Sequence, residues 1–146
     1  MAKTVTDRLG GAGLFGVEFF ITEDDVYFSE LSPRPHDTGM VTLISQNLSE
    51  FDLHLRAILG LEIPNIEYYN PSASHVILSK EESSTSPYFS GLAAALKENN
   101  VDIRIFNKPS ARLNRRMGVA LATDNDLKIA RKKAKTAANQ ITLKYN

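Results

Sequence analysis

Residues 16–39 read GVEFFITEDDVYFSELSPRPHDTG, and this stretch decides how the first half of the chain folds. Two runs rich in Phe, Val, Ile and Tyr, at 14–22 and 26–31, flank the acidic residues 23–25. Short apolar runs of this kind on either side of a polar turn predict a β-hairpin. The sequence therefore places two antiparallel strands near the N-terminus.

Two glutamates face each other in this predicted hairpin. A turn centred on Asp24 opposes the following pairs: Glu18 with Glu30, Phe20 with Phe28 and Thr22 with Val26. Side chains on opposed residues stand ~4.5–5.5 Å apart at Cβ, and like charges placed there repel each other. A hard divalent cation such as Mg²⁺, which takes carboxylate oxygens and water, would explain Glu18 and Glu30. The alternative is a turn of even length, which would send the two glutamates to opposite faces.

The segment that follows the hairpin, SPRPHDTG at 32–39, contains two prolines and is therefore stiff. It holds Arg34, His36 and Asp37 close to the two carboxylates. Arg34 suits bidentate recognition of phosphate or carboxylate, and Asp37 can accept a hydrogen bond from an amine or a hydroxyl. For His36, a structural hydrogen-bonded imidazole and a catalytic role are both open.

A second group of candidate residues is cationic. Lys108 stands in a Lys-Pro corner after a predicted strand, and Arg115 and Arg116 stand at the start of the next strand. Adjacent residues of a regular strand point to opposite faces, so both arginines reach one pocket only if Arg115 is still in the loop. Three cations in this span suit a phosphate monoester. Ordinary surface charges at a hairpin are the alternative.

The remaining elements follow from hydrophobic periodicity and capping residues. Ser49 before two acidic residues, with Gly60 at the far end, predicts a capped helix. Residues 64–71 are typical of a linker, and residues 80–86 of a polar loop. We expect further helices over 38–48, 88–99 and 126–141, and strands over 73–78, 101–106 and 117–123. The apolar stripes expected on the helices comprise Phe51, Leu55, Ile58 and Leu59, and then Leu127, Ala130, Ala134, Ala137, Ala138 and Ile141.

Composition limits the classes of function. The 146 residues carry 17 basic and 17 acidic side chains, so no global field favours nucleic acid or an anionic membrane. The chain has no cysteine, which excludes a thiolate metal site and a disulfide framework. No apolar run approaches the ~20 residues of a membrane-spanning helix. We therefore expect no nucleic-acid partner, no membrane contact and a cytoplasmic location.

The chain resembles a known family in two blocks. The first is GVEFF with FSELSPRPHDTGMVTLISQNLSEFDLH, and the second combines FNKP at 106–109 with RRMGVALA at 115–122. These blocks resemble the C-terminal portion of ATP-grasp enzymes, and within them the formate-dependent phosphoribosylglycinamide formyltransferases. The resemblance implies an α+β fold. Residues 1–66 would be the C-terminal half of an ATP-grasp domain, and residues 67–146 a small C-terminal subdomain of a sheet and helices.

The resemblance also implies an activity. ATP and formate would give formyl phosphate, which the amine of glycinamide ribonucleotide attacks in purine biosynthesis, and the enzyme would be a homodimer. The family's nucleotide-gripping part precedes this region, and the chain has no GxxxxGK[ST] or GxGxxG loop. We therefore expect a piece of a longer protein, inactive by itself. The implied residues are Glu18 and Glu30 for Mg²⁺, Arg34 for the phosphorylated carboxylate, and Asp37, Lys108, Arg115 and Arg116 for the substrate.

Two alternatives remain open on the sequence. One is the related carboxyaminoimidazole ribonucleotide synthetase branch, which shares the PRPH loop but tends to carry Asn where Asp37 stands and His where Met40 stands. The other is a non-catalytic module that binds a partner or dimerises. Three positions depart from the family pattern: Ser32 stands where many ATP-grasp enzymes have Asn, Asn107 replaces an expected glycine, and Arg112 adds a charge.

Overall fold

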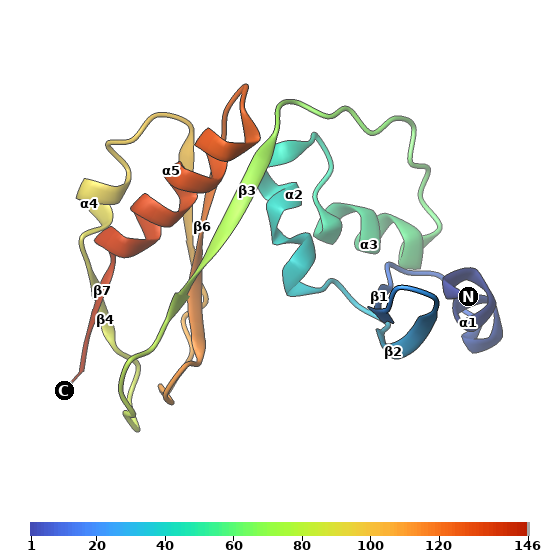
Figure 1. Ribbon diagram of the computed structural model, residues 1–146, viewed down its shortest axis with the longest axis horizontal. Coiled ribbons are helices and arrows are strands. Elements are labelled where there is room, and N and C mark those ends of the chain that lie inside the picture. The colour runs from blue at the N-terminus through green and yellow to red at the C-terminus, as the bar shows by residue number, and fades with distance from the viewer. Residues whose placement is uncertain (146) are drawn as a thin grey trace. The chain divides into compact units, whose positions relative to one another are not determined.

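A computed structural model describes residues 1–145 of the chain. The chain divides into two compact units, Met1–Glu67 (unit 1) and Tyr68–Asn146 (unit 2), whose elements are labelled in Figure 1. Unit 1 contains α1 (Ala2–Leu9), β1 (Gly16–Ile21), β2 (Val26–Ser32), the 3-10 helix η1 (Asp37–Val41), α2 (Thr42–Ser45) and α3 (Glu50–Leu59). Unit 2 contains β3 (Ser72–Leu78), β4 (Tyr88–Ser90), α4 (Leu92–Ala95), β5 (Val101–Ile105), β6 (Arg116–Thr123), α5 (Leu127–Gln140) and β7 (Thr142–Lys144). This mixture of helices and strands is the predicted α+β class.

The β1–β2 hairpin has an irregular register. Near the turn the pairs are Ile21 with Val26, Phe20 with Tyr27 and Phe19 with Phe28. Beyond the turn Glu18 pairs with Glu30, so Ser29 is skipped and forms a β-bulge. The predicted opposition of Glu18 and Glu30 is therefore confirmed, whereas the predicted pairs of Phe20 with Phe28 and Thr22 with Val26 are wrong. The turn has the even length of the alternative, and the bulge restores the opposition.

The helices of unit 1 begin at side-chain caps. Ser49 and Asp52 form a reciprocal capping box at the start of α3, and Gly60 ends the helix with a φ of 65°. Both ends agree with the prediction. The helix expected over 38–48 is instead broken into η1 and α2, and His36 caps the start of η1 by accepting from the Thr38 N–H.

Unit 1 leaves much of its apolar surface exposed. The stripe expected to be buried on α3 faces solvent, with Phe51 46% and Leu59 60% exposed. The hairpin residues Phe20 and Ile21 are exposed as well. Among residues 1–145, every buried apolar side chain belongs to unit 2. A two-stranded hairpin by itself has little stability in water without a further layer.

Unit 2 is built on an antiparallel sheet with the strand order β3-β6-β5. The central strand β6 is buried along most of its length, and α5 crosses one face of the sheet (Figure 1). Asp126 caps α5 by accepting from the N–H groups of Lys128 and Ile129. The expected strands over 73–78, 101–106 and 117–123 and the expected helix over 126–141 all correspond to these elements.

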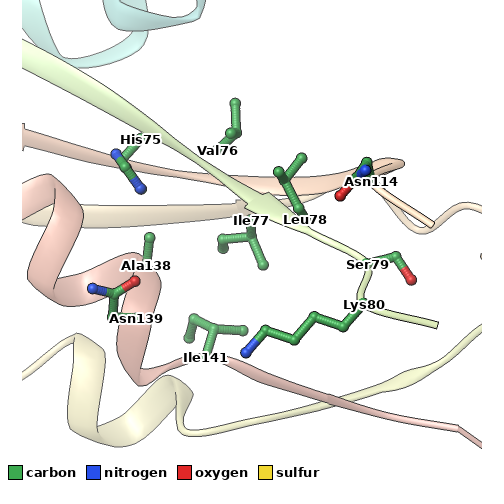
Figure 2. A pocket seen from close by; sticks show the side chains of 10 residues that line it. All are labelled: His75, Val76, Ile77, Leu78, Ser79, Lys80, Asn114, Ala138, Asn139 and Ile141. Atoms are coloured by element: carbon green, nitrogen blue, oxygen red, sulfur yellow. The ribbon is translucent and has the colours of Figure 1, made fainter.

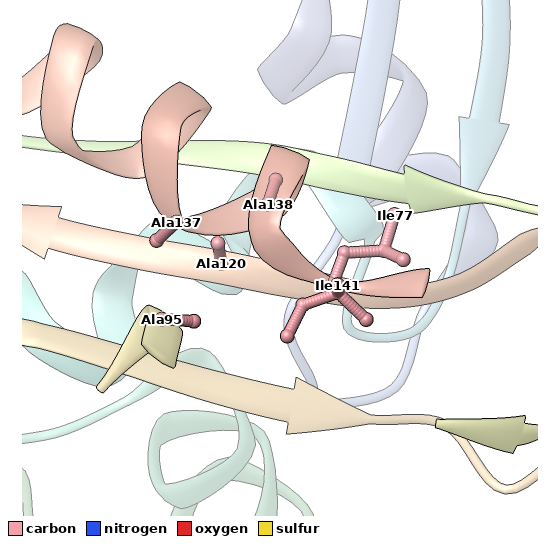
Figure 3. Packing of buried hydrophobic residues seen from close by; sticks show 6 residues of the cluster. All are labelled: Ile77, Ala95, Ala120, Ala137, Ala138 and Ile141. Atoms are coloured by element: carbon pink, nitrogen blue, oxygen red, sulfur yellow. The ribbon is translucent and has the colours of Figure 1, made fainter. Parts of the chain in front are cut away.

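Alanines let α5 lie close to the sheet. Ala134 is fully buried and Ala137 is 1% exposed, and both belong to the predicted apolar stripe of α5. Leu127, at the first residue of the helix, is 51% exposed and does not join the core. Figure 3 shows one core cluster, which comprises Ile77, Ala95, Ala120, Ala137, Ala138 and Ile141. Because these alanine side chains are small, α5 can pack closely against the strands.

The helix expected over 88–99 is wrong in its first part. Residues Tyr88–Ser90 form β4, which pairs antiparallel with β7, and only Leu92–Ala95 are α-helical. Gly91 separates the two with a φ of 86°, and a Cβ there would collide with the Gln140 carbonyl. The pairing with β7 joins segments far apart in the sequence, so local periodicity could not indicate it. No helix within the described residues combines the length and apolar character needed to cross a membrane.

Candidate functional site

Three potential metal ligands come together in unit 1. One ligand atom from each of Glu18, Glu30 and His36 lies within 4.8 Å of the others. The two glutamates are exposed and His36 is half-buried. The bulge at Ser29 places both carboxylates on one face of the hairpin, and the proline-rich loop brings His36 to them. Carboxylate oxygens in this arrangement suit a hard divalent cation that keeps part of its water shell.

The ring of His36 is held from both sides. Its Nε2 lies 3.3 Å from Glu18 Oε1, and its Nδ1 lies 3.3 Å from Asp37 Oδ1. The Thr38 N–H donates to Nδ1 at 3.4 Å, and the Thr38 hydroxyl is 3.0 Å from the same atom. Of the two predictions for this residue, the contacts support at least the structural one.

A buried carboxylate stands behind His36. Glu50, at the first turn of α3, is 3% exposed and accepts the backbone N–H of His36 at 2.9 Å through Oε2. Burial raises the pKa of the Glu50 carboxyl above its usual range, while the N–H and the charge of His36 act in the opposite direction. Glu50 was not among the predicted site residues, because an acid after a capping serine is expected to face the helix N-terminus.

The remaining loop residues differ in their surroundings. Asp37 lies beside the His36 ring, as described above, and thus adjoins the acidic group. Arg34 is exposed, and its Nη1 donates to the Pro35 carbonyl at 2.9 Å. That contact ties the guanidinium to its own loop. The structure therefore brings Glu18, Glu30, His36 and Asp37 together, whereas the contact given for Arg34 is with its own loop.

The cationic residues lie on the loop between β5 and β6 and at the first residue of β6. Arg115 precedes the first residue of β6 and is still in the loop, which is the condition under which both arginines can reach one pocket. Its Nη1 donates to the carbonyl and the hydroxyl of Ser110, both at 3.0 Å. Lys108 is half-buried, with Nζ 5.6 Å from the centre of the Phe106 ring. Arg116 begins β6 and is exposed.

Two asparagines in left-handed conformations shape this loop. Asn107 has a φ of 47° and Asn114 a φ of 60°. Asparagine adopts this region more readily than most residues, so Asn107 can fill a position where the family pattern led us to expect glycine. The loop is also tied down, because the N–H of Asn114 donates to the Ser79 carbonyl at 2.9 Å.

The cations of the loop repel one another. The pKa of Lys108 is lowered, mainly by burial and then by the charges of Arg115 and Arg112. Arg112 and Arg115 also line a shallow hollow of about 370 Å³, together with Glu82 and residues between them. An anion bound here would offset the repulsion among these cations, and Lys and Arg suit a phosphate group.

A separate hollow of about 320 Å³ lies between β3 and the end of α5. Figure 2 shows Lys80 extended toward Ile141, with His75 on β3 and Asn139 on α5. Its lining includes no residue that the sequence analysis proposed for a site. Unit 2 therefore has a hollow away from the cationic loop as well.

Comparison with known proteins matches the chain in two consecutive parts. The family model described as "PurT, C-terminal" matches residues 72–141, and that of the ATP-grasp domain matches residues 1–51. A protein of Synechococcus elongatus named formate-dependent phosphoribosylglycinamide formyltransferase is 65% identical over 143 residues, which cover 98% of this chain. One of Nostoc sp. with the same name is 66% identical over 141 residues, which cover 97% of the chain. In both cases the chain spans 36% of the relative's length.

Solved structures of two differently named enzymes are similar to this chain. "Glycinamide-RNase-transformylase T" from Mycobacterium tuberculosis is 35% identical with a TM-score of 0.73, over 97% of this chain and 39% of that one. N5-carboxyaminoimidazole ribonucleotide synthetase from Thermotoga maritima is 30% identical with a TM-score of 0.85, over 99% of this chain and 41% of that one. Both structures are similar to this chain in fold, and the relatives with 65–66% identity carry the formyltransferase name.

Proposed function

Because this chain belongs to the family of formate-dependent phosphoribosylglycinamide formyltransferases, which are ATP-grasp proteins, we propose that it forms part of an enzyme that formylates glycinamide ribonucleotide. The enzyme would use ATP and formate in purine biosynthesis. The observation that carries the proposal is the identity of 65% over nearly the whole chain, together with the opposed carboxylates of Glu18 and Glu30.

Unit 1 supplies the cation site in this proposal. Glu18 and Glu30 would hold Mg²⁺, whose positive charge would offset that of the nucleotide phosphates during phosphoryl transfer to formate. The opposition of Glu18 and Glu30 supports this role, because two facing carboxylates repel and a bound cation would relieve that repulsion. Asp37, beside the His36 ring, would accept a hydrogen bond from the substrate amine and orient it.

Unit 2 supplies the phosphate site. Lys108, Arg115 and Arg116 would bind the 5′-phosphate of glycinamide ribonucleotide, and the mutual repulsion around Lys108 would be relieved by that anion. The amine of the bound substrate would attack the formyl carbon of formyl phosphate, and the phosphate of that intermediate would leave. Arg34 would stabilise the phosphorylated formate, which requires that it exchange its contact with the Pro35 carbonyl for the substrate.

The proposal assigns no turnover to this chain by itself. The chain spans just over a third of its relatives, and it has no glycine-rich phosphate loop. The exposed apolar faces of the hairpin and α3 would be covered by further parts of an ATP-grasp domain. A homodimer and a cytoplasmic location stay predictions.

The main alternative is the carboxyaminoimidazole ribonucleotide synthetase activity, since a structure of that name has a TM-score of 0.85 to this chain. Asp37 and Met40 argue against it, because that branch tends to carry Asn and His at these positions. The relatives at 62–66% identity are named as formyltransferases.

A chimaera tests the proposal directly. This chain would replace the matching part of the Synechococcus elongatus relative, and product would be measured with glycinamide ribonucleotide and with aminoimidazole ribonucleotide. We expect formylation that depends on ATP and formate, and none when Glu18 and Glu30 are both changed to Gln. Turnover of aminoimidazole ribonucleotide instead would favour the alternative branch. A folded chimaera without either activity would favour a non-catalytic module.

A further inference from the structure

A chain of contacts runs from the interior of unit 1 to one of the two opposed carboxylates. Glu50 Oε2 accepts the backbone N–H of His36 at 2.9 Å, and the His36 Nε2 lies 3.3 Å from Glu18 Oε1. The main chain and the ring of one residue thus connect a buried acid to an exposed acid. Nothing in the roles proposed above uses Glu50.

The structure is built closely around Glu50. A Cβ at Gly39 would collide with Glu50 Oε2, so the backbone of η1 passes against the carboxylate. The N–H of Glu50 donates to the Thr42 hydroxyl at 2.8 Å, and that hydroxyl donates to the Gly39 carbonyl at 2.6 Å. Glu50 Oε1 is closed off from solvent and has no hydrogen-bond partner within the described part of the chain. A buried polar atom without a partner is costly, which indicates that the contact with His36 is what this side chain provides.

The ring orientation of His36 follows from its neighbours. The Thr38 N–H donates to Nδ1, so in a neutral ring the proton is on Nε2 and points at Glu18 Oε1. In a protonated ring, Nε2–H donates to Glu18 and Nδ1–H to Asp37 Oδ1. Both forms present a donor to Glu18, whereas the Nδ1–H tautomer would set the Nε2 lone pair against Glu18 and point its proton toward the Thr38 N–H. A Cβ at Gly16 would lie 3.0 Å from the Cβ of His36, so the ring is also confined by the hairpin.

We propose that Glu50 and His36 are positioning residues of the cation site: Glu50 fixes the main chain of His36, and the Nε2–H of His36 holds Oε1 of Glu18. The second oxygen of Glu18 and the carboxylate of Glu30 are then left for the cation. The inference rests on the proposed function only in taking Glu18 and Glu30 as the ligands. It differs from direct ligation by His36, for which Nε2 would have to be unprotonated.

The ring proton gives a readout that does not depend on activity. Long-range proton–nitrogen spectra of the chain, with histidine labelled, distinguish a protonated from an unprotonated ring nitrogen. We expect Nε2 of His36 to carry a proton without metal and to keep it when Mg²⁺ is added. A proton on Nδ1 alone, or the loss of the Nε2 proton on Mg²⁺ binding, would overturn the proposal.

Matched variants test the part played by Glu50. Removing a residue that orients a metal ligand weakens metal binding by about 10-fold or more, so we expect this loss for Glu50→Ala with Mn²⁺ as the probe. Glu50→Gln keeps an acceptor for the His36 N–H, so its Mn²⁺ affinity should stay within about 3-fold of the wild type. Weakening this hydrogen bond costs less than removing it, as Glu50→Ala does. Asp52→Asn is the control, since Asp52 lies on the same first turn but contacts Ser49 rather than His36. An Mn²⁺ affinity lowered equally by Asp52→Asn and Glu50→Ala would show a general effect of α3 and contradict the proposal.

The ring is tested in the same way. His36→Gln retains an N–H donor near the position of Nε2, whereas His36→Ala removes it. We expect Gln to restore most of the Mn²⁺ affinity that Ala loses, and equal losses would contradict the proposal. If the wild type binds no Mn²⁺ through Glu18 and Glu30, the metal assignment under the proposed function fails. The contact between His36 and Glu18 is then judged by the ring proton alone, with Glu18→Gln as the comparison.

Discussion

Glu18 lies directly opposite Glu30 across the β1–β2 hairpin because Ser29 is skipped in the pairing. The turn between the strands has an even length, which in a regular ladder would oppose Glu18 to Ser29 and send Glu30 to the other face. The bulge shifts the register by one residue and returns both carboxylates to the same side. An irregularity in one strand thus brings together the two carboxylates of the proposed cation site.

The opposed glutamates should affect stability and metal binding in opposite directions. Glu18→Gln removes the repulsion and is expected to raise the free energy of unfolding by about 0.2–1 kcal/mol without metal. The same change should weaken Mn²⁺ binding by about 10-fold or more, because a charged ligand is lost. Chemical denaturation and calorimetric titration measure the two effects. Glu23→Gln, in the turn of the same hairpin, is the control and should change neither; equal effects of both variants would contradict an opposed pair.

The cationic loop should bind phosphate through Lys108. Lys108→Met is expected to weaken the binding of ribose 5-phosphate by about 10-fold or more, the effect of losing a hydrogen bond to a charged group. The phosphate should also raise the melting temperature of the wild type, since a ligand that binds the folded state stabilises it. Lys128→Met, on the exposed face of α5, removes the same charge elsewhere. A loss as large for Lys128 as for Lys108 would mean that the anion responds only to net charge.

The capping box of α3 predicts a dependence of stability on pH. Hydrogen bonds from the side chain and backbone of Ser49 lower the pKa of Asp52 below its usual value. A carboxyl with a lowered pKa in the folded state stabilises above its unfolded value of about 3.9, and this stabilisation is lost as the pH falls through the folded value. Denaturation at pH 7 and at pH 3 should therefore show a smaller difference for Asp52→Asn than for the wild type.

Ser49→Ala removes the other half of the capping box. It is expected to cost about 1 kcal/mol at pH 7, which is typical of a lost helix cap.

Asp24→Asn, in the hairpin turn, serves as the control for the pH series. If Asp24→Asn reduces the difference between the two pH values as much as Asp52→Asn, the effect belongs to overall charge and not to the cap.

The tight contact between α5 and the sheet predicts sensitivity to side-chain volume. Ala134→Leu inserts a larger side chain at a fully buried position and is expected to destabilise unit 2 by about 1–3 kcal/mol. Lys132→Leu places the same side chain on the exposed face of α5 and should change stability by less than about 0.5 kcal/mol. Thermal unfolding of both variants measures the difference. Similar costs would show that the face of α5 is not packed as described.

Local chemistry made part of the fold predictable. Ser49 and Gly60 mark the ends of α3, and the alanine stripe marks α5, because caps and helical period act within a few residues. The prediction of a helix beginning at residue 88 was wrong because β4 pairs with β7, which lies far along the chain. The opposition of Glu18 and Glu30 was predicted from a regular turn, and its actual origin, the bulge, has no local sequence signal that we used.

The sequence by itself determined the α+β class, the family, the capped helices and the residue types of the two candidate groups, because these depend on period, caps and motifs. Only the tertiary structure decided that Ser29 is skipped, that Arg115 stays in the loop and that Glu50 is buried against the main chain of His36. These features depend on which segments meet. Contacts between residues distant in the sequence are set by packing and hydrogen bonding of the whole unit, and no local pattern encodes them.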